Sequence, residues 1–573
     1  MPEIVRRVAA SDAVQRLVDA GCDPRLARLF AARGLDSADG LKRSLDGLAS
    51  PERLANSGDA ARLLADAIAR RERLLVIADY DADGATACAV AVKALRAFGA
   101  TIDYLVPNRF EHGYGLTPEI VREAASRKPD ILITVDNGIA AMDGIAEAHR
   151  LGIRVLVTDH HLPGPSLPQA ACIVNPNQPG CDFPSKSLAG VGVIFYTMLQ
   201  LRAELRRRGA FSLAKPEPNL ASLLDLVALG TVADVVRLDA NNRILVAQGL
   251  ARIRAGRASP GIAALLEVAG RSAAKAAAYD LAFAVGPRLN AAGRLTDMSL
   301  GIECLLAGDG ARALDLATKL DRLNRERREI EASMQESALA MLEGVTVERG
   351  YVLALHRPEW HAGVVGLLAS RLRERYNRPV FAFAADASGK LKGSGRSIPG
   401  LHLRDALDLM DKRMPGMLER FGGHAAAAGA TIDAARFADF ARAFEAVARE
   451  LLGEDDLAER IETDGRLPAA ELTCELAQLL QAEVWGQGFP EPRFDARFVV
   501  QSQRVVGEKH LKLVLGLEGK RFDAIRFNQA EPLPEAIEAV FRLDVDVYSG
   551  TPRLQLAIEH WRAGAAAEPH SGL

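Results

Sequence analysis

The sequence predicts a multidomain α/β protein that ends in a small β-barrel. Short apolar runs alternate with helical segments between residue 74 and about residue 160, and the same alternation returns after residue 350. Near the end of the chain, several segments instead alternate apolar and polar residues with a period of two, which is typical of barrel strands. The 573 residues are enough for about three or four domains, at roughly 100–200 residues each.

The composition narrows the class of protein. The net charge is −3, so attraction to nucleic acid would need a local basic patch and not the overall balance. The six cysteines include no CxxC pair, which disfavours a structural zinc site and favours a reducing compartment. The N-terminus has no apolar core of a secretory signal, and no run of about 18 apolar residues occurs. We therefore expect a cytoplasmic protein that makes no membrane contact.

Two regions at the start of the chain differ in pattern. Residues 1–70 are expected to form an N-terminal region of short amphipathic helices that stop at Gly21, Gly34 and Gly40. Residues 71–310 are expected to form a domain that begins with a parallel sheet and continues as helices after residue 221. The sheet strands are expected at residues 74–78, 102–106, 131–135 and 155–158, with helices at 85–98 and 118–127.

The middle of the chain is predicted to contain a connecting helix, residues 311–345, and a second α/β domain, residues 346–455. Charged residues of the helix, among them Asp321 and Arg327, fall between its apolar positions, which favours a solvated strut between domains. The second domain is expected to have strands at 351–355 and 380–384, a helix at 364–376 and glycine-rich turns.

The C-terminal region, residues 456–565, is predicted to be a barrel of the oligonucleotide-binding (OB) type. Its strands are expected at residues 494–502, 511–517, 521–527, 539–548 and 553–561. Basic residues gather in this region, and Lys509, Lys512 and Arg521 are candidates for an electrostatic groove that holds a single strand. Residues 566–573 are expected to be a disordered tail.

The first candidate chemical motif is VIADYDADGAT, in which Asp79, Asp81 and Asp83 follow an apolar strand. Alternation along an extended segment would place the three carboxylates on one side, where their repulsion calls for bound cations. A calcium loop of the EF-hand type is the alternative, but it needs a glutamate at its twelfth position, where this chain has Val90.

Further candidate ligands follow other strands of the same predicted sheet. Asp136 follows one strand, and Asp159, His160 and His161 follow the next. Because parallel strands end at one edge of a sheet, we expect these side chains to converge there. Asp234, in the apolar stretch LGTVADVVRL, becomes a candidate only in their company. Carboxylates combined with imidazole favour Mn²⁺ or Mg²⁺.

The motifs ADYDADG, TVDNG, VTDHH and GTVADV, in this order, resemble those of the DHH phosphoesterase superfamily, and in particular its single-strand-specific DNA exonucleases. The resemblance covers roughly residues 45–565. It implies a site for two divalent cations, with Asp136 bridging them, His161 at the phosphate and Asp159 supporting a histidine. The metal ligands that it implies are Asp79, Asp81, Asp83, Asp136, His160 and Asp234. We count Asp136, Asp159 and His161 as catalytic.

Other motifs fit nucleic-acid binding, in part through the same resemblance. PNRFEHGYGL offers a phosphate-gripping arginine and a stacking tyrosine, and FGGHAAAAG resembles the substrate-binding motif of the DHHA1-like domain that accompanies DHH domains. The candidates outside the barrel are Arg109, His112, Tyr114, Arg288, Asn290, Arg294, Arg396, Ser397, Gly422, Gly423 and His424.

The predicted function is therefore metal-dependent hydrolysis of single-stranded DNA in the 5′ to 3′ direction, a polarity that only the resemblance implies. DNA repair and recombination, with a single-strand-binding protein and a helicase as partners, would follow. Two alternatives stay open. One is a DHH phosphoesterase acting on short oligonucleotides, cyclic dinucleotides or pyrophosphate, and the other is a non-catalytic single-strand-binding scaffold. The barrel disfavours the first, and the intact acidic and histidine positions disfavour the second.

Overall fold

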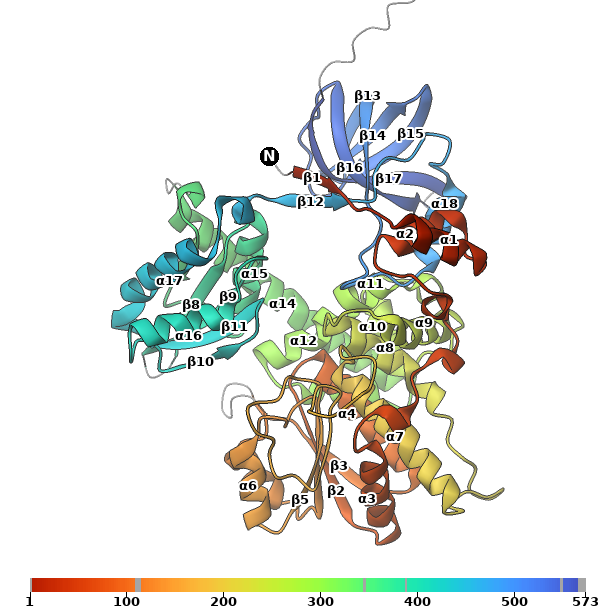
Figure 1. Cartoon of the computed structure of the whole chain (residues 1–573), viewed down its shortest axis with the longest axis vertical. Coiled ribbons are helices and arrows are strands. Elements are labelled where there is room, and N and C mark those ends of the chain that lie inside the picture. Colours follow the sequence, from red (N-terminus) through yellow and green to blue (C-terminus); the bar gives the residue numbers. More distant parts are fainter. Residues whose placement is uncertain (1–2, 109–114, 344–346, 387–388, 547–549, 565–573) are drawn as a thin grey trace, which may run out of the picture. The chain divides into compact units, whose positions relative to one another are not determined.

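The chain divides into two compact units in the computed structural model, which describes residues 3–108, 115–343, 347–386, 389–546 and 550–564 (Figure 1). The large unit contains residues 5–293, 297–321 and 462–573, and the small unit contains residues 1–4, 294–296 and 322–461. No helix among the described residues is long and apolar enough to cross a membrane.

The N-terminal region is helical, as expected, although the chain first forms strand β1. The elements are β1 (Glu3–Arg6), α1 (Ser11–Asp19), α2 (Pro24–Ala31) and α3 (Ser57–Ala69). Gly21 and Gly34 have φ angles of 87° and 82°, as glycines just after a helix often do. The expected stop at Gly40 is wrong, because this buried glycine lies inside a short 3₁₀ helix, Ala38–Leu41.

The predicted parallel sheet is present in the large unit, in the order β3-β2-β4-β5-β6. Its strands are β2 (Arg73–Ala78), β3 (Thr101–Leu105), β4 (Ile131–Val135), β5 (Arg154–Thr158) and β6 (Cys172–Val174). The sequence did not reveal β6. Its helices are α4 (Ala82–Phe98), α5 (Pro118–Ala125), α6 (Met142–Arg150) and α7 (Gly190–Arg207).

Helices cover both faces of this sheet. On one face, Ile120 of α5 and Ile145 of α6 share a buried cluster with Leu75, Ile77 and Leu132 of the strands. On the other, α4 packs on β2 and β3, and α7 packs on α4 (Figure 1). Burial on both faces explains why the strands are continuous apolar runs in the sequence. It also leaves the edge at the carboxyl ends of the strands as the place for polar residues.

The helical continuation predicted after residue 221 is also present. It comprises α8 (Leu224–Ala233), α9 (Ala240–Arg254), α10 (Pro260–Val268), α11 (Ala278–Asp280), a π-helical segment (Leu281–Val285), α12 (Gly286–Leu295) and α13 (Ser299–Leu306). Helix α14 (Gly310–Leu342) follows as one helix of 33 residues.

The expectation that the charged faces of α14 are solvated is wrong for Asp321 and Arg327, which are both buried. Asp321 accepts a charged hydrogen bond from Arg288 at 2.7 Å. Arg327 donates to Asn324 at 2.7 Å and pairs with Glu331, one turn further along the same helix. Burial of these charges is tolerated because each has a partner, which a helical pattern in the sequence does not reveal.

The small unit contains a mixed five-stranded sheet in the order β10-β11-β9-β8-β7. The elements are β7 (Leu353–His356), α15 (Val365–Tyr376), β8 (Val380–Ala385), β9 (Lys390–Arg396), α16 (Leu403–Arg413), β10 (Arg420–Gly423), β11 (Ala427–Asp433) and α17 (Phe437–Leu451). Strands β9 to β11 were predicted as glycine-rich turns. Gly393 and Gly395 are instead strand residues at which a Cβ would lie 2.3 and 2.5 Å from the rings of Phe383 and Phe381.

The C-terminal barrel is closed, in the order β13-β14-β15-β17-β16. Strand β12 (Arg460–Thr463) pairs with β1, and α18 (Cys474–Ala482) precedes the barrel. The barrel strands are β13 (Phe494–Val506), β14 (His510–Leu517), β15 (Lys520–Arg526), β16 (Ala536–Asp546) and β17 (Arg553–Ala563). All pairs are antiparallel except β15 with β17, and closure removes the open edges. The prediction of an OB-type barrel is confirmed.

Candidate active site

The carboxyl ends of three neighbouring strands bring the candidate residues together. Ala78 of β2 pairs with Val135 of β4, and Val135 pairs with Thr158 of β5. An aspartate directly follows each of these strands: Asp79 follows β2, Asp136 follows β4 and Asp159 follows β5. Because the strand ends are paired, the three aspartates lie at the same edge of the sheet. The convergence expected from the strand ends is present, and all three side chains are buried.

The backbone of the DYDADG motif is not extended throughout, so the reason given above for grouping its carboxylates is wrong. Helix α4 begins at Ala82, and the side chain of Asp81 caps it by accepting the Gly84 N–H at 3.0 Å. Gly84 allows the turn, because a Cβ there would lie 2.6 Å from the carbonyl oxygen of Asp79. Asp83 thus reaches the site from the first turn of a helix and not from a strand.

Asp83 lies at the N-terminus of α7. Its two carboxylate oxygens accept the backbone N–H groups of Gly190 at 2.6 Å and Val191 at 2.9 Å. Complete burial, followed by the negative charge of Asp81, raises the pKa of Asp83 to about 7 although these N–H donors favour the charged form. A cation beside the carboxylate would reverse that shift.

Asp136 occupies the centre of the cluster. Its φ of 63° is in the left-handed region, which costs a non-glycine residue energy and is a form of strain often found at functional sites. Burial, and then the charges of Asp83 and Asp81, hold the pKa of Asp136 well above its usual value. Gly190 is required here, since a Cβ would lie 2.6 Å from the Cβ of Asp136.

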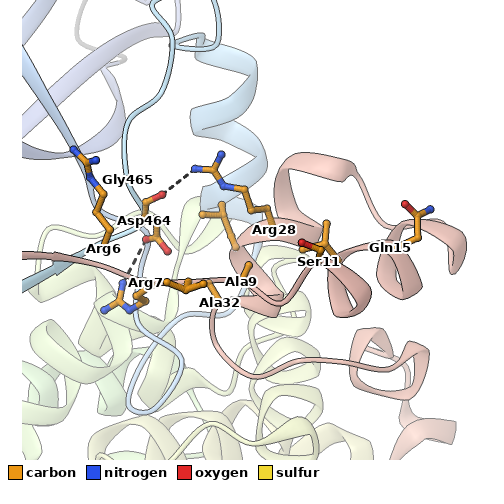
Figure 2. Close-up of a pocket in the computed structure, with 12 residues that line it drawn as sticks. Arg6, Arg7, Ala9, Ser11, Gln15, Arg28, Ala32, Asp464 and Gly465 are labelled. Carbon is orange, nitrogen blue, oxygen red and sulfur yellow. Dashed lines mark hydrogen bonds and ion pairs between the residues drawn. The ribbon is translucent and has the colours of Figure 1, made fainter.

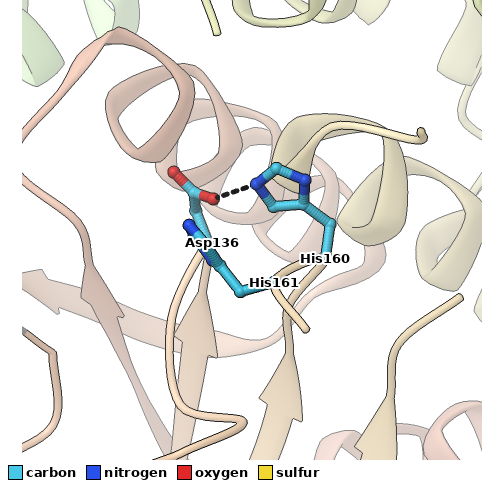
Figure 3. A group of neighbouring side chains, drawn as sticks. All are labelled: Asp136, His160 and His161. Carbon is cyan, nitrogen blue, oxygen red and sulfur yellow. Dashed lines mark ion pairs between the residues drawn. The ribbon is translucent and has the colours of Figure 1, made fainter. Parts of the chain in front are cut away.

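His160 joins Asp136 to Asp234. Its Nε2 atom lies 3.0 Å from Oδ1 of Asp136, as Figure 3 shows, and 3.5 Å from Oδ2 of Asp234. Asp234 is the C-cap of α8, where burial and then the charge of Asp83 raise its pKa well above the usual value. The lone aspartate of an apolar stretch is therefore part of the same group.

Asp159 holds the histidine pair in place. Its Oδ1 accepts the backbone N–H groups of His160 at 2.7 Å and His161 at 3.1 Å and lies 2.8 Å from Nδ1 of His161, while Oδ2 accepts the Ile139 N–H at 2.9 Å. Burial works to lower the pKa of His161, but the bond to Asp159 and the surrounding carboxylates outweigh it and raise the pKa to about 9. These contacts fit the orienting role expected for Asp159.

The donor atoms fall into three groups, each with its atoms within 4.8 Å of one another. The groups are Asp79 with Asp81 and Asp136, Asp83 with His160 and Asp234, and Asp136 with His160 and His161. Oxygen and imidazole donors at this spacing fit Mn²⁺ or Mg²⁺. The raised pKa values of the central carboxylates show that burial and mutual repulsion outweigh the hydrogen bonds they accept, as expected where cations bind.

Residues of the GPRLNAAGRL motif pack against the backbone of the DYDADG motif. Asn290 accepts the Ala82 N–H at 2.8 Å, between Asp81 and Asp83. Gly293 lets α12 approach, because a Cβ there would lie 1.9 Å from the carbonyl oxygen of Tyr80. Arg288 is buried and bonded to Asp321, so a contact with DNA would have to share its guanidinium with that carboxylate. The structure thus gives Asn290 a positioning contact that sequence reasoning missed.

Gly190 and Asn137 were also missed. The Asn137 amide donates to the carbonyl oxygens of Val135 at 2.9 Å and Ile77 at 3.2 Å, tying together the ends of two strands. The TVDNG motif contained Asn137, but only as a turn residue. Around Gly190, the small residues of the segment AGVGVIF indicate only that a helix begins there. Nothing in the segment indicates that carboxylates contact it.

The remaining nucleic-acid candidates are spread over other parts of the molecule. Arg109, His112 and Tyr114 lie outside the described residues. In the small unit, Arg294 donates to the Gly363 carbonyl at 3.3 Å, Arg396 donates to Ser394 and Gly395, and Ser397 donates to the Leu401 carbonyl at 2.8 Å. Gly422, Gly423 and His424 are exposed at the end of β10.

In the barrel, Lys509 and Arg521 are exposed, and Lys512 is half-buried with its ammonium 3.9 Å from a carboxylate oxygen of Asp546. Among the aromatic residues near them, Phe527 is 49% exposed and stands edge-on to His510, with ring centroids 5.5 Å apart. These contacts leave the basic residues accessible to a phosphate backbone.

A pocket of about 480 Å³ lies between the N-terminal segment and the chain just before the barrel, and none of the candidate site residues lines it. Its arginines already have protein partners. Arg7 and Arg28 bond to Asp464, as Figure 2 shows, and Arg6 bonds to Asp495 at 2.7 Å. The pocket contains none of the candidate ligands, so we assign the chemistry to the sheet edge.

Comparison with known protein families places this geometry in a class. The chain matches the DHH family N-terminal domain over residues 73–231, the DHHA1 domain over residues 348–450 and the RecJ OB domain over residues 463–560. The cluster at the sheet edge lies in and just after the first match. The fold and the site therefore define a DHH-type phosphoesterase with two accessory domains.

Closely related proteins sharpen this class. The chain is 52% identical to the single-stranded-DNA-specific exonuclease RecJ of Dickeya dadantii, over 93% of this chain and 95% of the relative, and 51% identical to that of Escherichia coli, over 94% and 95%. The crystal structure of RecJ from Thermus thermophilus in complex with Mn²⁺ matches with a TM-score of 0.82 at 31% identity, covering 99% of this chain and 80% of the other. The same protein has also been solved with Mg²⁺. The chain belongs to the RecJ family.

Proposed function

We propose that this protein is a metal-dependent exonuclease that hydrolyses phosphodiester bonds of single-stranded DNA from the 5′ end towards the 3′ end. The observation that carries the proposal is the convergence of five aspartates and two histidines on one sheet edge, in groups whose donor atoms lie within 4.8 Å of one another. The names of its relatives support single-stranded DNA as the substrate. The 5′ to 3′ direction is part of the proposal and rests on the resemblance of the motifs.

The metal ligands would be Asp79, Asp81, Asp83, Asp136, His160 and Asp234. Bound divalent cations would stabilise charge on the phosphate and make water acidic enough to attack near neutral pH. The protein's own contribution is to hold these carboxylates close together against their repulsion. It does so with backbone N–H groups at Asp81 and Asp83 and with the Asn290 contact to the intervening residue.

His161 and Asp159 would act on the phosphate side. The His161 imidazole suits a hydrogen bond to a phosphate oxygen, because its contacts with Asp159 hold the ring in one orientation. Asp159 fixes the ring through Nδ1, so Nε2 is the nitrogen that would face the phosphate. Asp136 and His160 each occur in two of the three donor groups, but only a carboxylate has two oxygens to offer, so Asp136 is the residue best placed to be shared between two cations.

The domains would divide the work. Residues 71–310 would carry out hydrolysis, and the DHHA1-like domain, residues 346–455, would bind substrate near the exposed Gly422, Gly423 and His424. The barrel, residues 456–565, would hold the strand electrostatically through Lys509, Lys512 and Arg521. The segment 311–345 would connect them. A substrate of this kind also fits action in the cytoplasm during DNA repair and recombination, beside a single-strand-binding protein and a helicase.

The test is degradation of labelled DNA by the purified protein with Mn²⁺, with Mg²⁺ or with EDTA. Single strands labelled at the 5′ end or the 3′ end and a blunt duplex are compared. We expect metal-dependent release of the 5′ label as short product from single strands only. Absence of metal-dependent degradation would overturn the nuclease assignment and favour a scaffold. Attack from the 3′ end would overturn the polarity, and activity confined to dinucleotides would favour a small-substrate phosphoesterase.

A further inference from the structure

Two aromatic side chains, Tyr279 and Phe283, stand exposed on the surface of the large unit. They are 54% and 62% exposed, and their ring centroids lie 4.8 Å apart with 33° between the ring planes. Of the large apolar side chains exposed in the described part of the chain, only these two and Phe527 are aromatic. Aromatic surface of this size is normally buried, so a contiguous exposed pair points to a ligand.

The backbone beneath the rings is unusual and firmly held. Tyr279 lies in α11, and Phe283 lies in the π-helical segment that follows, a geometry found mostly at functional sites. The carboxylate of Asp280 accepts the Ala277 N–H at 2.9 Å, and Arg254 donates to the Ala276 carbonyl at 2.8 Å. The start of the helix is thus fixed by two bonds, and the rings rise from a preorganised base.

The segment that carries this aromatic pair contacts the helix that supplies Asp234. The π-helical segment packs against α8, the helix that ends at Asp234. Gly286, directly after the segment, meets Ala233, where a Cβ at the glycine would lie 3.2 Å from the alanine Cβ. Phe283 precedes Gly286 by three residues, about 5 Å of helix rise. The backbone of Phe283 therefore lies about one helical turn from Gly286, which contacts the end of α8 beside Asp234.

The charges beside the rings favour a nucleic-acid ligand. Lys275 is exposed, and Arg271, also exposed, is 3.4 Å from the carboxylate of Asp280. Flat apolar rings next to basic groups form the combination that binds single strands, with bases on the rings and phosphates at the cations. A base inside a duplex already has both faces stacked and could not use such a surface.

We propose that Tyr279 and Phe283 form a stacking platform for an unpaired nucleobase of the substrate, a few nucleotides from the bond that is hydrolysed. The platform rests on the proposed function and adds to it a residue-level source of single-strand preference. It would hold the strand in register, so that the phosphate near Asp234 and His161 is presented in one position.

The experiment uses full-length protein in EDTA and single-stranded oligonucleotides that carry 2-aminopurine at successive positions from the 5′ end. A base that stacks on the rings loses fluorescence. We expect quenching at one or two adjacent positions with the wild type, and its loss in Tyr279→Ala/Phe283→Ala. Affinity for the strand should fall roughly 5- to 100-fold, the range measured for removing base–aromatic stacking. Leu151→Ala, which removes another exposed apolar side chain of this unit, should change neither.

Two further variants separate stacking from a structural role. Tyr279→Phe keeps the ring and should keep the quenching, whereas Tyr279→Leu/Phe283→Leu keeps apolar bulk and should lose it. An abasic site at the quenched position should weaken wild-type binding but not the binding of the leucine variant. Equal quenching in all variants, or equal loss on abasic substitution in both proteins, would overturn the platform.

The same preparations are assayed with Mn²⁺ on unmodified single strands. Wild-type activity together with unaltered quenching in the variants would reject the platform and leave the nuclease assignment intact. Absence of wild-type activity would reject the nuclease assignment itself.

Discussion

The sheet edge and the C-terminal barrel use charge in opposite ways. At the sheet edge, the aspartates lie close together and away from water. Burial and mutual repulsion therefore raise the pKa values of Asp83, Asp136 and Asp234. On the barrel, Lys509 and Arg521 stand in solvent, where each charge is largely screened. Burying like charges together destabilises the fold and is explained by a specific cationic ligand. Exposed charges cost the fold little free energy and tolerate substitution. Removing one charge should therefore have a far larger effect at the edge than on the barrel.

The largest effect is expected for Asp136→Ala. The variant removes the carboxylate common to two of the donor groups, so hydrolysis of single strands should fall at least about 1000-fold while strand binding in EDTA stays within about threefold. Turnover of a labelled strand and fluorescence anisotropy measure the two quantities. Asp143→Ala, an exposed aspartate of α6, serves as the control. Near-normal turnover at saturating Mn²⁺ would contradict the shared role.

A smaller effect is expected for Asn290→Ala. Loss of the bond to the Ala82 N–H loosens the turn between Asp81 and Asp83, so the Mn²⁺ concentration needed for half-maximal activity should rise about 10- to 100-fold. Activity at saturating Mn²⁺ should recover most of the wild-type value, which separates positioning from catalysis. Unchanged metal dependence in the variant would show that the turn between Asp81 and Asp83 keeps its conformation without the Asn290 bond.

The barrel should respond more weakly still. Lys509→Gln/Arg521→Gln removes two exposed charges, so the slope of log affinity against log salt should decrease by about 1.4 on a single strand, with about a tenfold loss of affinity in low salt. Turnover of strands too short to reach the barrel should not change. Binding titrations between 50 mM and 300 mM salt, chosen as roughly the range where screening is strong, measure the slope. An unchanged slope would remove these residues from the groove.

The smallest effect concerns stability against pH in metal-free protein. Because its pKa is raised to about 9, His161 stabilises the fold fully below its ordinary pKa of about 6.5 and progressively less as the pH rises through 9. The difference in unfolding free energy between wild type and His161→Gln should therefore shrink between pH 6 and pH 9.5, by about 1 kcal/mol after allowance for partial exposure. Urea unfolding in EDTA measures it, and a constant difference would contradict the Asp159–His161 pairing.

The two regions also differ in how well the sequence predicted them. At the sheet edge, the apolar strands were recognisable, and the residues after them had to meet because parallel strands end together. Alternation with period two likewise predicted the barrel strands. The roles of Asn290 and Gly190 were not predictable in this way, because each acts through a contact with a residue about 55 to 210 positions away.

Burial of charge was the other feature that the sequence concealed. Asp321 and Arg327 look like solvent-facing residues of a long helix, but partners from elsewhere in the chain or one turn away make their burial tolerable. Strands β9 to β11 were concealed for a related reason, since their glycines serve close packing against phenylalanine rings and not turns. In each case the missing information was a tertiary contact.

The most direct test of the metal centre is a crystal structure of the protein grown with Mn²⁺ and measured at a wavelength where manganese scatters anomalously. The proposal predicts two anomalous peaks at the carboxyl edge of the parallel sheet, one within reach of Asp79 and Asp81, one within reach of Asp83 and Asp234, and Asp136 contacting both. Peaks only at other acidic clusters, or no peak at this edge at saturating Mn²⁺, would contradict it.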